Sequence, residues 1–393
     1  MIPLNEAQSQ VLAVAAPRVA TVPLEDSLHH ILSDDIISPQ YAPAFDNSAM
    51  DGYALCLQPH ELNKSEITRH VSQVIAAGEN KHDELLSHHC AKIMTGAPVP
   101  AGANTVIPIE RTQVNHKEIT FEGPFKLGQH IRKQGEEFTL GDTLLKSGQQ
   151  VRPAVIGLLA SLGYVNVPVH QVPRVAILAT GSELLPVGAP LTPGKLRDSN
   201  SDTLAACVRE AGAIPVKFGI LPDNPLAIQA AFEKAFSTCD MVLSSGGVSV
   251  GDFDYVQDIL LKLGLEKKFW KVAIKPGKPV LFGTLAEKLC FGIPGNPASA
   301  LVVFELLVRP ALKQMLGATQ TFRPTQKARL LHAVKPSSGR LHFMRAFYDA
   351  EEQTLEPFVG QGSSNLWTAA RANALLPVHE AYEAGAQVNA LIL

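Results

Sequence analysis

The stretch Ser244-Ser245-Gly246-Gly247-Val248-Ser249-Val250-Gly251-Asp252-Phe253-Asp254-Tyr255 is the segment of this chain that decides its fold. An apolar run at 241–243 precedes it and a helical pattern at 256–263 follows, which predicts a strand, a glycine-rich turn and a helix. Glycine permits positive φ angles and close approach of a ligand to the backbone. A helix start presents unpaired N–H groups to an anion. The acids Asp252 and Asp254 at this corner suit an anion bound together with Mg²⁺, although a turn simply capped by Asp252 fits the same residues.

Composition restricts the class of protein and its compartment. The chain has 393 residues and a formal net charge of −3, which argues against a general nucleic-acid binder. Its 5 cysteines are scattered without a CxxC pair, so we expect buried thiols in a reducing compartment. No stretch has the length of a membrane span or the pattern of a signal peptide. We therefore expect a cytoplasmic protein that acts on small molecules.

The middle of the chain, residues 171–317, alternates apolar runs with helical patterns. Strands are predicted at 174–179, 214–218, 241–243, 269–274, 280–282 and 289–293, and helices at 201–211, 225–236, 256–263 and 297–315. This alternation is typical of a mainly parallel sheet covered on both faces. Ligands of such sheets bind beyond the carboxyl ends of the strands.

The flanking segments have different patterns. Residues 45–140 are rich in glycine, proline and short alternating runs, which favours a β-rich domain. Residues 1–44 and 141–170 are more helical and bracket it, so we expect a helical domain in two segments with the β-rich domain inserted. Residues 318–393 read as short strands of a C-terminal β-barrel. The predicted fold class is a multidomain α/β protein.

Several loops carry residues suited to anion and metal chemistry. Lys275 and Lys278 lie at a strand end and each is followed directly by a proline, which holds it; ordered cations meet an anion at lower entropic cost. Glu183, Asp254 and Asp51 would supply the few carboxylates that Mg²⁺ prefers. Other interpretations remain open.

For three of these loops the residues also fit a structural role. Asp51 before Gly52 also fits a simple turn, and the loop around Thr95 fits a rigid connection as well as a preorganised donor. Asn296 and Pro297 fit a helix cap as well as an anion site. His88-His89-Cys90 is read as structural, because adjacent strand residues face opposite ways.

These loops together resemble the MoeA family of molybdopterin molybdenumtransferases, whose relatives include the C-terminal part of gephyrin. The matching motifs are PAFDNSAMDGYAL (43–55), IMTGAPVPAGA (93–103), ATGSEL (179–184), DSNS (198–201), SSGGVSVGDFDYV (244–256), AIKPGKPV (273–280) and GIPGNPASA (292–300). The resemblance implies the same domain arrangement with a central molybdopterin-binding α/β domain. It also implies an elongated homodimer with the active site between subunits.

The resemblance further implies a Mg²⁺-dependent reaction in which adenylylated molybdopterin and molybdate give molybdenum cofactor and AMP. The catalytic positions carried over are Asp51, Thr95, Glu183, Asp223, Asp254, Lys275 and Lys278. The substrate-binding positions are Ser245, Gly246, Gly247, Ser249, Gly251, Asp198, Asn200, Pro294, Gly295, Asn296 and Pro297. The metal positions are Asp254, Glu183, Asp51 and Glu137.

The chain departs from the family pattern at a few positions. Where relatives often carry RRRGED, this chain has Arg132-Lys133-Gln134-Gly135-Glu136-Glu137, and the longer acid Glu137 changes the expected metal geometry. Ser182 stands where many relatives carry Asp. The C-terminal barrel matches weakly, and Arg345 with Ser363-Ser364-Asn365 are the residues suggested there for molybdate.

Two other functions remain as alternatives. One is the adenylyltransferase that acts one step earlier and shares the loops of the α/β domain, and the other is a non-catalytic scaffold on the same fold. The sequence does not separate molybdate from tungstate. By the resemblance, the expected protein partners are the molybdopterin adenylyltransferase and the enzymes that accept the cofactor.

Overall fold

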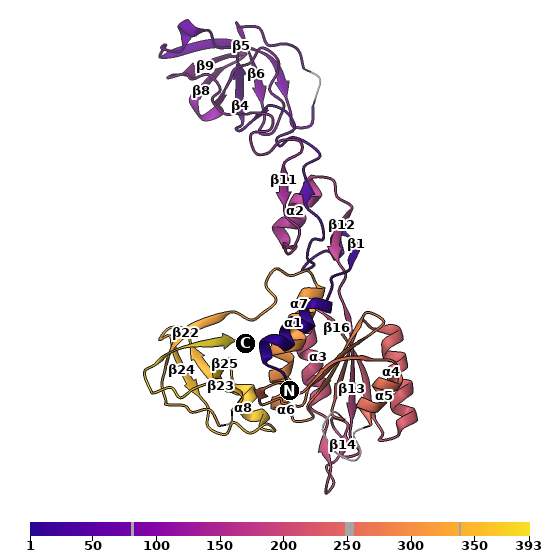
Figure 1. Cartoon of the computed structure of the whole chain (residues 1–393). Helices are drawn as coiled ribbons and strands as arrows, with labels where there is room; N and C mark the ends of the chain where they lie inside the picture. The colour runs from indigo at the N-terminus through magenta and orange to yellow at the C-terminus, as the bar shows by residue number, and fades with distance from the viewer. Residues whose placement is uncertain (80–81, 248–254, 338) are drawn as a thin grey trace. The chain divides into compact units, whose positions relative to one another are not determined.

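The computed structural model describes residues 1–79, 82–247, 255–337 and 339–393 (Figure 1). The chain forms two compact units, of which the first comprises Met1–Asp34, Ser147–Gly157 and Val165–Leu393 and the second Asp35–Lys146 and Leu158–Tyr164. Within the described ranges, no helix is both long enough and apolar enough to cross a membrane.

The centre of the first unit is a sheet with strand order β16-β13-β17-β21-β20-β18. The first four of these strands are parallel to one another. β20 is antiparallel to its neighbour β21, and β18 is antiparallel to β20. Along β13, Val175 and Ile177 point to one face of the sheet and Ala176 and Leu178 to the other, each into a separate apolar cluster. This sheet is the mainly parallel one that the sequence predicts. Its strands are β13 (Arg174–Thr180), β16 (Ile214–Leu221), β17 (Met241–Ser245), β18 (Glu266–Trp270), β20 (Leu281–Leu285) and β21 (Lys288–Ile293).

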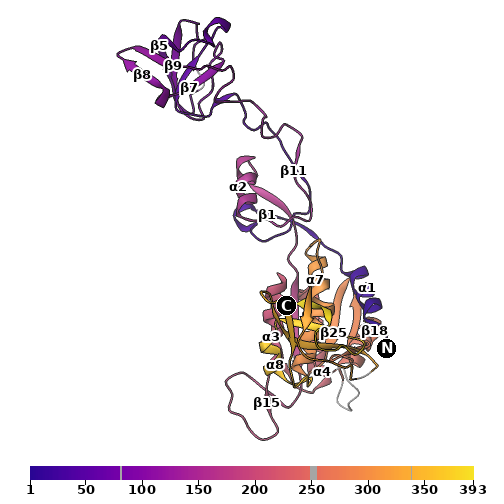
Figure 2. The same ribbon diagram turned by 90° about the vertical axis from the view of Figure 1, so that its left-hand side faces the viewer.

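Helices cover both faces of this sheet (Figures 1 and 2). One face packs against α1, α3, α6 and α7, and the other against α4 and α5. The helices are α1 (Leu4–Val14), α3 (Asn200–Ala211), α4 (Pro225–Thr238), α5 (Val256–Lys262), α6 (Pro297–Val303) and α7 (Arg309–Met315).

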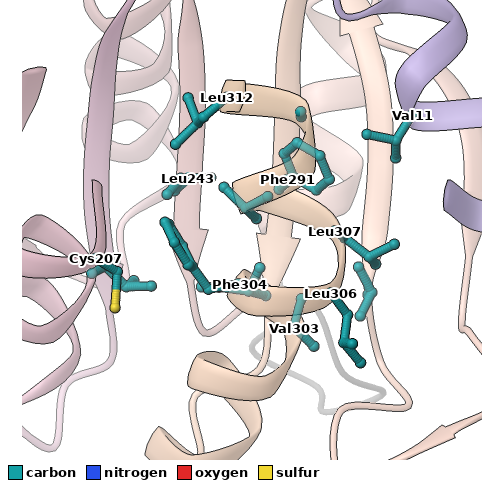
Figure 3. Packing of buried hydrophobic residues seen from close by; sticks show 14 of the residues in the cluster. Val11, Cys207, Leu243, Phe291, Val303, Phe304, Leu306, Leu307 and Leu312 are labelled. Carbon is teal, nitrogen blue, oxygen red and sulfur yellow. The ribbon is translucent and has the colours of Figure 1, made fainter. Parts of the chain in front are cut away.

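The long helix predicted at 297–315 is interrupted by a π-helical turn, Phe304–Val308, between α6 and α7. Pro310 has no N–H to donate to the carbonyl of Leu306 four residues earlier. Gln8 of α1 supplies the missing donor, because its Nε2 lies 3.1 Å from that carbonyl oxygen. Figure 3 shows Phe304, Leu306 and Leu307 among the buried side chains of this region. The irregular turn thus keeps its backbone hydrogen-bonded while filling the core.

The C-terminal part of the first unit is a closed barrel with the strand order β23-β24-β22-β26-β25, which β23 and β25 close by pairing. A short strand of the α/β domain, β19, adds to the barrel by pairing in parallel with β23. Helix α8, which the sequence pattern does not predict, is capped by the Asn365 side chain. The elements are β19 (Ile274–Lys275), β22 (Thr325–Leu330), β23 (Leu341–Asp349), β24 (Thr354–Pro357), α8 (Leu366–Arg371), β25 (Ala374–Val378) and β26 (Gln387–Ile392).

The second unit is built on a sheet with the order β7-β4-β6-β5-β9-β8, which packs apolar side chains such as Tyr53 and Phe121 on one face and Ile75 and Ile93 on the other. This β-rich fold agrees with the prediction from its short alternating runs. Its strands are β2 (Ile36–Ile37), β3 (Asn47–Ser48), β4 (Gly52–Leu55), β5 (Glu66–Ile75), β6 (His89–Ile93), β7 (Thr105–Pro108), β8 (Thr112–Asn115), β9 (Glu118–Glu122), β10 (Ile131–Arg132) and β11 (Thr143–Leu145). Of the elements in the flanking segments, β1 (Val19–Pro23) and β12 (Asn166–His170) pair with each other and belong to the first unit, and the residues of α2 (Pro153–Ser161) are divided between the two units.

Candidate functional site

The loops beyond the carboxyl ends of β13, β17 and β21 enclose a pocket of about 1060 Å³. Its position is the one expected for ligands of a parallel sheet. Of the predicted site residues it is lined by Glu183, Asp198, Asn200, Asp223, Ser245, Gly246, Gly247, Pro294, Gly295, Asn296 and Pro297. Residues far apart in the sequence therefore meet here, as the motifs predict.

The glycine-rich turn begins in contact with the neighbouring strand ends. Gly246 and Gly247 have φ angles of 88° and 69°, and the Gly246 N–H donates to the carbonyl of Ile293 at 3.1 Å. A Cβ atom on Gly247 would lie 2.4 Å from Cγ2 of Val256. Both the backbone conformation and the space thus require glycine. The predicted site residues Ser249, Gly251 and Asp254 lie outside the described residues.

Asn200, at the start of α3, joins the loops that line the pocket. Its Nδ2 donates to Oγ of Ser245 at 2.7 Å and to the carbonyl of Gly295 at 2.8 Å. Its Oδ1 and Oγ1 of Thr180 are buried, with no hydrogen-bond partner in the described part of the chain. Buried polar atoms are rarely left unpaired, so these two suit a polar ligand or water.

The pocket lining is acidic. Asp198 accepts a hydrogen bond from the Ser201 N–H at 3.0 Å, and Asp223 accepts one from the Ser182 N–H at 2.9 Å. Glu183 has no ion pair with any described residue. No cluster of three metal-binding side chains occurs in the ranges the structure covers.

Arg197 is the only basic side chain among the described residues of the pocket lining. It lies on β15 (Leu196–Arg197), which pairs with β14 (Leu184–Leu185), and the loop between them projects from the sheet (Figure 2). Its Nε donates to the carbonyl of Ala189 at 3.1 Å. Arg197 is not among the residues predicted from the motifs, although it directly precedes the Asp198-Ser199-Asn200 motif.

The two predicted lysines do not line this pocket. Lys275 lies on β19 at the junction with the barrel, and its Nζ donates to Oγ of Ser337. A Cβ atom on Gly277 would lie 2.6 Å from Cγ2 of Val303, so the loop that carries both lysines packs tightly against α6. Pro279, directly after Lys278, does line the pocket.

The start of α6 is closed by a loop of the barrel. The N–H groups of Ala298 and Ser299 donate to the carbonyl of Ser363 at 3.0 and 3.3 Å. Nδ2 of Asn296 also donates to Oγ of Ser363 at 3.1 Å. Amides that the sequence offers to an anion are therefore used to attach the barrel to the α/β domain.

Arg345 is the largest fully buried side chain of the barrel, with an exposed fraction of 2%. Its Nη2 donates to the carbonyls of Gly360 and Gly362 at 3.3 and 3.0 Å. Its Nε and Nη1 have no partner among the described residues, and burial lowers the pKa of the guanidinium. Ser364, from the same loop, lines the pocket.

Asp51, Thr95 and Glu137 belong to the second unit, and all are exposed. The Thr95 N–H and hydroxyl both donate to Oδ1 of Asp51 at 2.7 Å. These two hydrogen bonds lower the pKa of Asp51, because they stabilise the carboxylate. Within this unit, burial raises the pKa of Cys90 to about 12, so its thiol stays protonated, as a structural cysteine would.

Family models cover most of the chain. The MoeA N-terminal region, domains I and II, matches residues 2–163, a "Probable molybdopterin binding domain" matches 176–314, and the MoeA C-terminal region, domain IV, matches 327–393.

Known proteins resemble the chain over nearly its whole length. A molybdopterin molybdenumtransferase from Haemophilus influenzae is 40% identical, covering 90% of this chain and 87% of the relative. One from Bacillus subtilis is 36% identical, covering 100% and 94%. A solved molybdopterin biosynthesis MoeA protein from Pyrococcus horikoshii is 30% identical with a TM-score of 0.86, covering 100% of this chain and 99% of that one.

Proposed function

Because this chain belongs to the MoeA family, we propose that it inserts molybdenum from molybdate into adenylylated molybdopterin and releases AMP. It thereby acts as a molybdopterin molybdenumtransferase in molybdenum cofactor biosynthesis. The family expected from the sequence motifs is confirmed. Relatives of this name match through all regions of the chain, including those that the adenylyltransferase alternative does not need.

The observation that carries the proposal is the pocket in which the separate motifs meet. The glycine-rich turn supplies backbone groups at close range for a phosphate, and Asn200 fixes the loops around it. The unpaired Oγ1 of Thr180 and Oδ1 of Asn200 add hydrogen-bonding capacity for the pterin or its phosphate. A substrate that carries both a heterocycle and phosphates fits this mixture of polar groups.

Mg²⁺ suits the acidic lining, because it prefers few carboxylates together with water and substrate phosphates. Glu183, with Asp254, would hold the ion, and Asp51 and Glu137 of the second unit are the further predicted ligands. When bound, the ion would neutralise charge on the phosphate oxygens. The carboxylates alone would repel an anionic substrate, which is a physical reason to expect the metal.

Lys275, Lys278 and Arg345 are the cations we assign to the anionic groups. Lys275 or Lys278 would supplement the glycine-rich turn at the substrate phosphate, since a helix end alone contributes only about 0.3–1 kcal/mol. Arg345, with Ser363, Ser364 and Asn365 beside it, is the proposed molybdate contact. Its unpaired Nε and Nη1 support this assignment, because buried donors without a partner suit an oxyanion.

We further propose a homodimer in which Asp51 and Thr95 act on the partner's site. A two-fold dimer lets each subunit lend its β-rich domain to the other. Mixing inactive Asp51→Asn protein with inactive Asp254→Asn protein would then restore activity, since each mixed dimer holds one intact site. Subunit exchange without recovery of activity would contradict this arrangement.

The expected partners are molybdopterin adenylyltransferase and enzymes that accept the cofactor. The cytoplasm is the proposed compartment, and the unpaired cysteines support it.

The test is an incubation of purified protein with adenylylated molybdopterin, Mg²⁺ and molybdate. AMP release that depends on both molybdate and Mg²⁺, with molybdenum retained in the pterin product, is the expected result. Formation of adenylylated molybdopterin from ATP and molybdopterin would instead assign the earlier step, and absence of both reactions would favour a scaffold. Replacing molybdate by tungstate measures the preference between the two oxyanions.

A further inference from the structure

The barrel and the α/β domain are joined at the residue pair Lys275 and His342. In the pairing of β19 with β23, these two residues lie opposite each other. Nη1 of Arg340 donates to the carbonyl of Ile274 at 3.0 Å, and the N–H of Leu341 donates to the carbonyl of Ala273 at 3.2 Å. The backbone of Lys275 is therefore fixed against the barrel and does not end in a free loop.

A chain of hydrogen bonds continues from the Lys275 side chain into the barrel. Its Nζ donates to Oγ of Ser337, and that Oγ lies 3.3 Å from Nδ1 of His342. An ammonium group has only donors, so the Ser337 oxygen accepts and its hydroxyl proton is left for Nδ1. This direction requires that His342 carries its proton on Nε2.

His342 is kept in the neutral form that this series of hydrogen bonds needs. Its exposed fraction is 3%. Burial, with Lys275, Arg345 and Arg340 nearby, lowers the pKa of His342 to about 4. The Nε2 atom is buried, with no partner among the residues described. A protonated imidazole would turn Nδ1 into a donor and break the chain.

We propose that Ser337 and His342 are positioning residues, which hold in one orientation the ammonium group of Lys275, a residue assigned above to the anionic substrate. A lysine side chain rotates about four bonds and loses considerable conformational entropy when it is ordered. The barrel orders it before substrate binds, so that the binding step retains more of the interaction energy. This inference rests on the proposed function, because it concerns a residue of that site.

A double-mutant cycle tests the proposal. Ser337→Ala is expected to lower kcat/KM for adenylylated molybdopterin about 10- to 100-fold, the range for a displaced catalytic group. Ser337→Thr, the matched control, keeps the hydroxyl and retains most of the activity. In a Lys275→Ala background, Ser337→Ala should change nothing further. Equal losses in both backgrounds would show that Ser337 acts independently of Lys275 and would overturn the proposal.

Substitutions of His342 separate positioning from packing. The side-chain oxygen of Asn reaches the place of Nδ1, whereas that of Gln reaches the place of Nε2. His342→Asn should therefore retain more activity than His342→Gln, although both remove the ring. Equal activity of the two variants would contradict the role of Nδ1.

One readout does not need turnover. Nitrogen NMR of histidine-labelled protein, with His342→Asn to assign the signal, should show His342 neutral and protonated on Nε2. It should also show a changed Nδ1 signal in Ser337→Ala. A proton on Nδ1 overturns the inference even in an active enzyme. The expected NMR result in a protein without molybdenum insertion would leave the hydrogen-bond chain standing and refute the proposed function.

Discussion

Acidification should weaken the barrel through His342, and the structure sets the size of the effect. The pKa of this residue falls from its ordinary value of 6.5 to about 4 in the folded protein. Between these values the unfolded chain binds a proton that the folded chain does not, so stability decreases as the pH falls. The full contribution is present above pH 6.5 and is lost as the pH approaches 4. At about 1.4 kcal/mol per pKa unit, the loss is about 2 kcal/mol at pH 5 and about 3 kcal/mol at pH 4.

The measurement is urea unfolding of the parent protein and of His342→Asn at pH 7.5 and pH 5. The sequence contains two tryptophans, Trp270 and Trp367, which both lie in the first unit, so intrinsic fluorescence follows that unit. The substitution itself also changes the free energy of unfolding by an amount that does not depend on pH. The prediction therefore concerns only the difference between the values at pH 7.5 and pH 5. The parent should lose about 2 kcal/mol more than the variant between the two pH values. Equal losses would refute the reasoning, because they would show that His342 takes up its proton equally in both states.

Four substitutions test the pocket and the second unit. Gly247→Ala should lower the free energy of unfolding by about 1–3 kcal/mol more than Gly188→Ala in urea melts, because both have positive φ but only the former lacks space for a Cβ. Asn200→Ala should lower the free energy of unfolding by about 2–4 kcal/mol, because the Ser245 hydroxyl and the Gly295 carbonyl lose their hydrogen-bond donor. It should also raise KM for adenylylated molybdopterin. Asp51→Asn should reduce AMP release and leave thermal unfolding nearly unchanged, because the exposed amide oxygen of the variant can still accept both hydrogen bonds from Thr95. Thr95→Val removes the hydroxyl donor and should raise the pKa of Asp51, measured by carboxyl NMR. A destabilised Asp51→Asn protein would assign this residue to its turn instead.

The layered α/β fold could be predicted because its strands are buried on both faces. Such strands read as continuous apolar runs, and β13 and β17 are found where these runs occur. The glycine-rich turn could also be predicted from local sequence, since only glycine fits at position 247. Local signals therefore sufficed for elements and for several residues of the pocket lining.

The cross-domain contacts could not be predicted, because they depend on tertiary register. Ser337 lies 62 positions from Lys275 in the sequence, and nothing at either position indicates their hydrogen bond. The π-turn before α7 follows from Pro310, yet its repair by Gln8 depends on how α1 packs. The domain boundaries, the dimer and the metal ligands stay predictions.

Two of the hydrogen-bonded contacts between the barrel and the α/β domain concern the proposed site. β19 extends the barrel and carries Lys275, and Ser363 caps the helix start beside Asn296. In isolation, the α/β domain would leave the amides of Ala298 and Ser299 without this acceptor and Lys275 without Ser337. A helix start whose amides are unoccupied attracts anions by itself. With the barrel attached, those amides are used internally, so discrimination among anions passes to side chains whose orientation the barrel fixes.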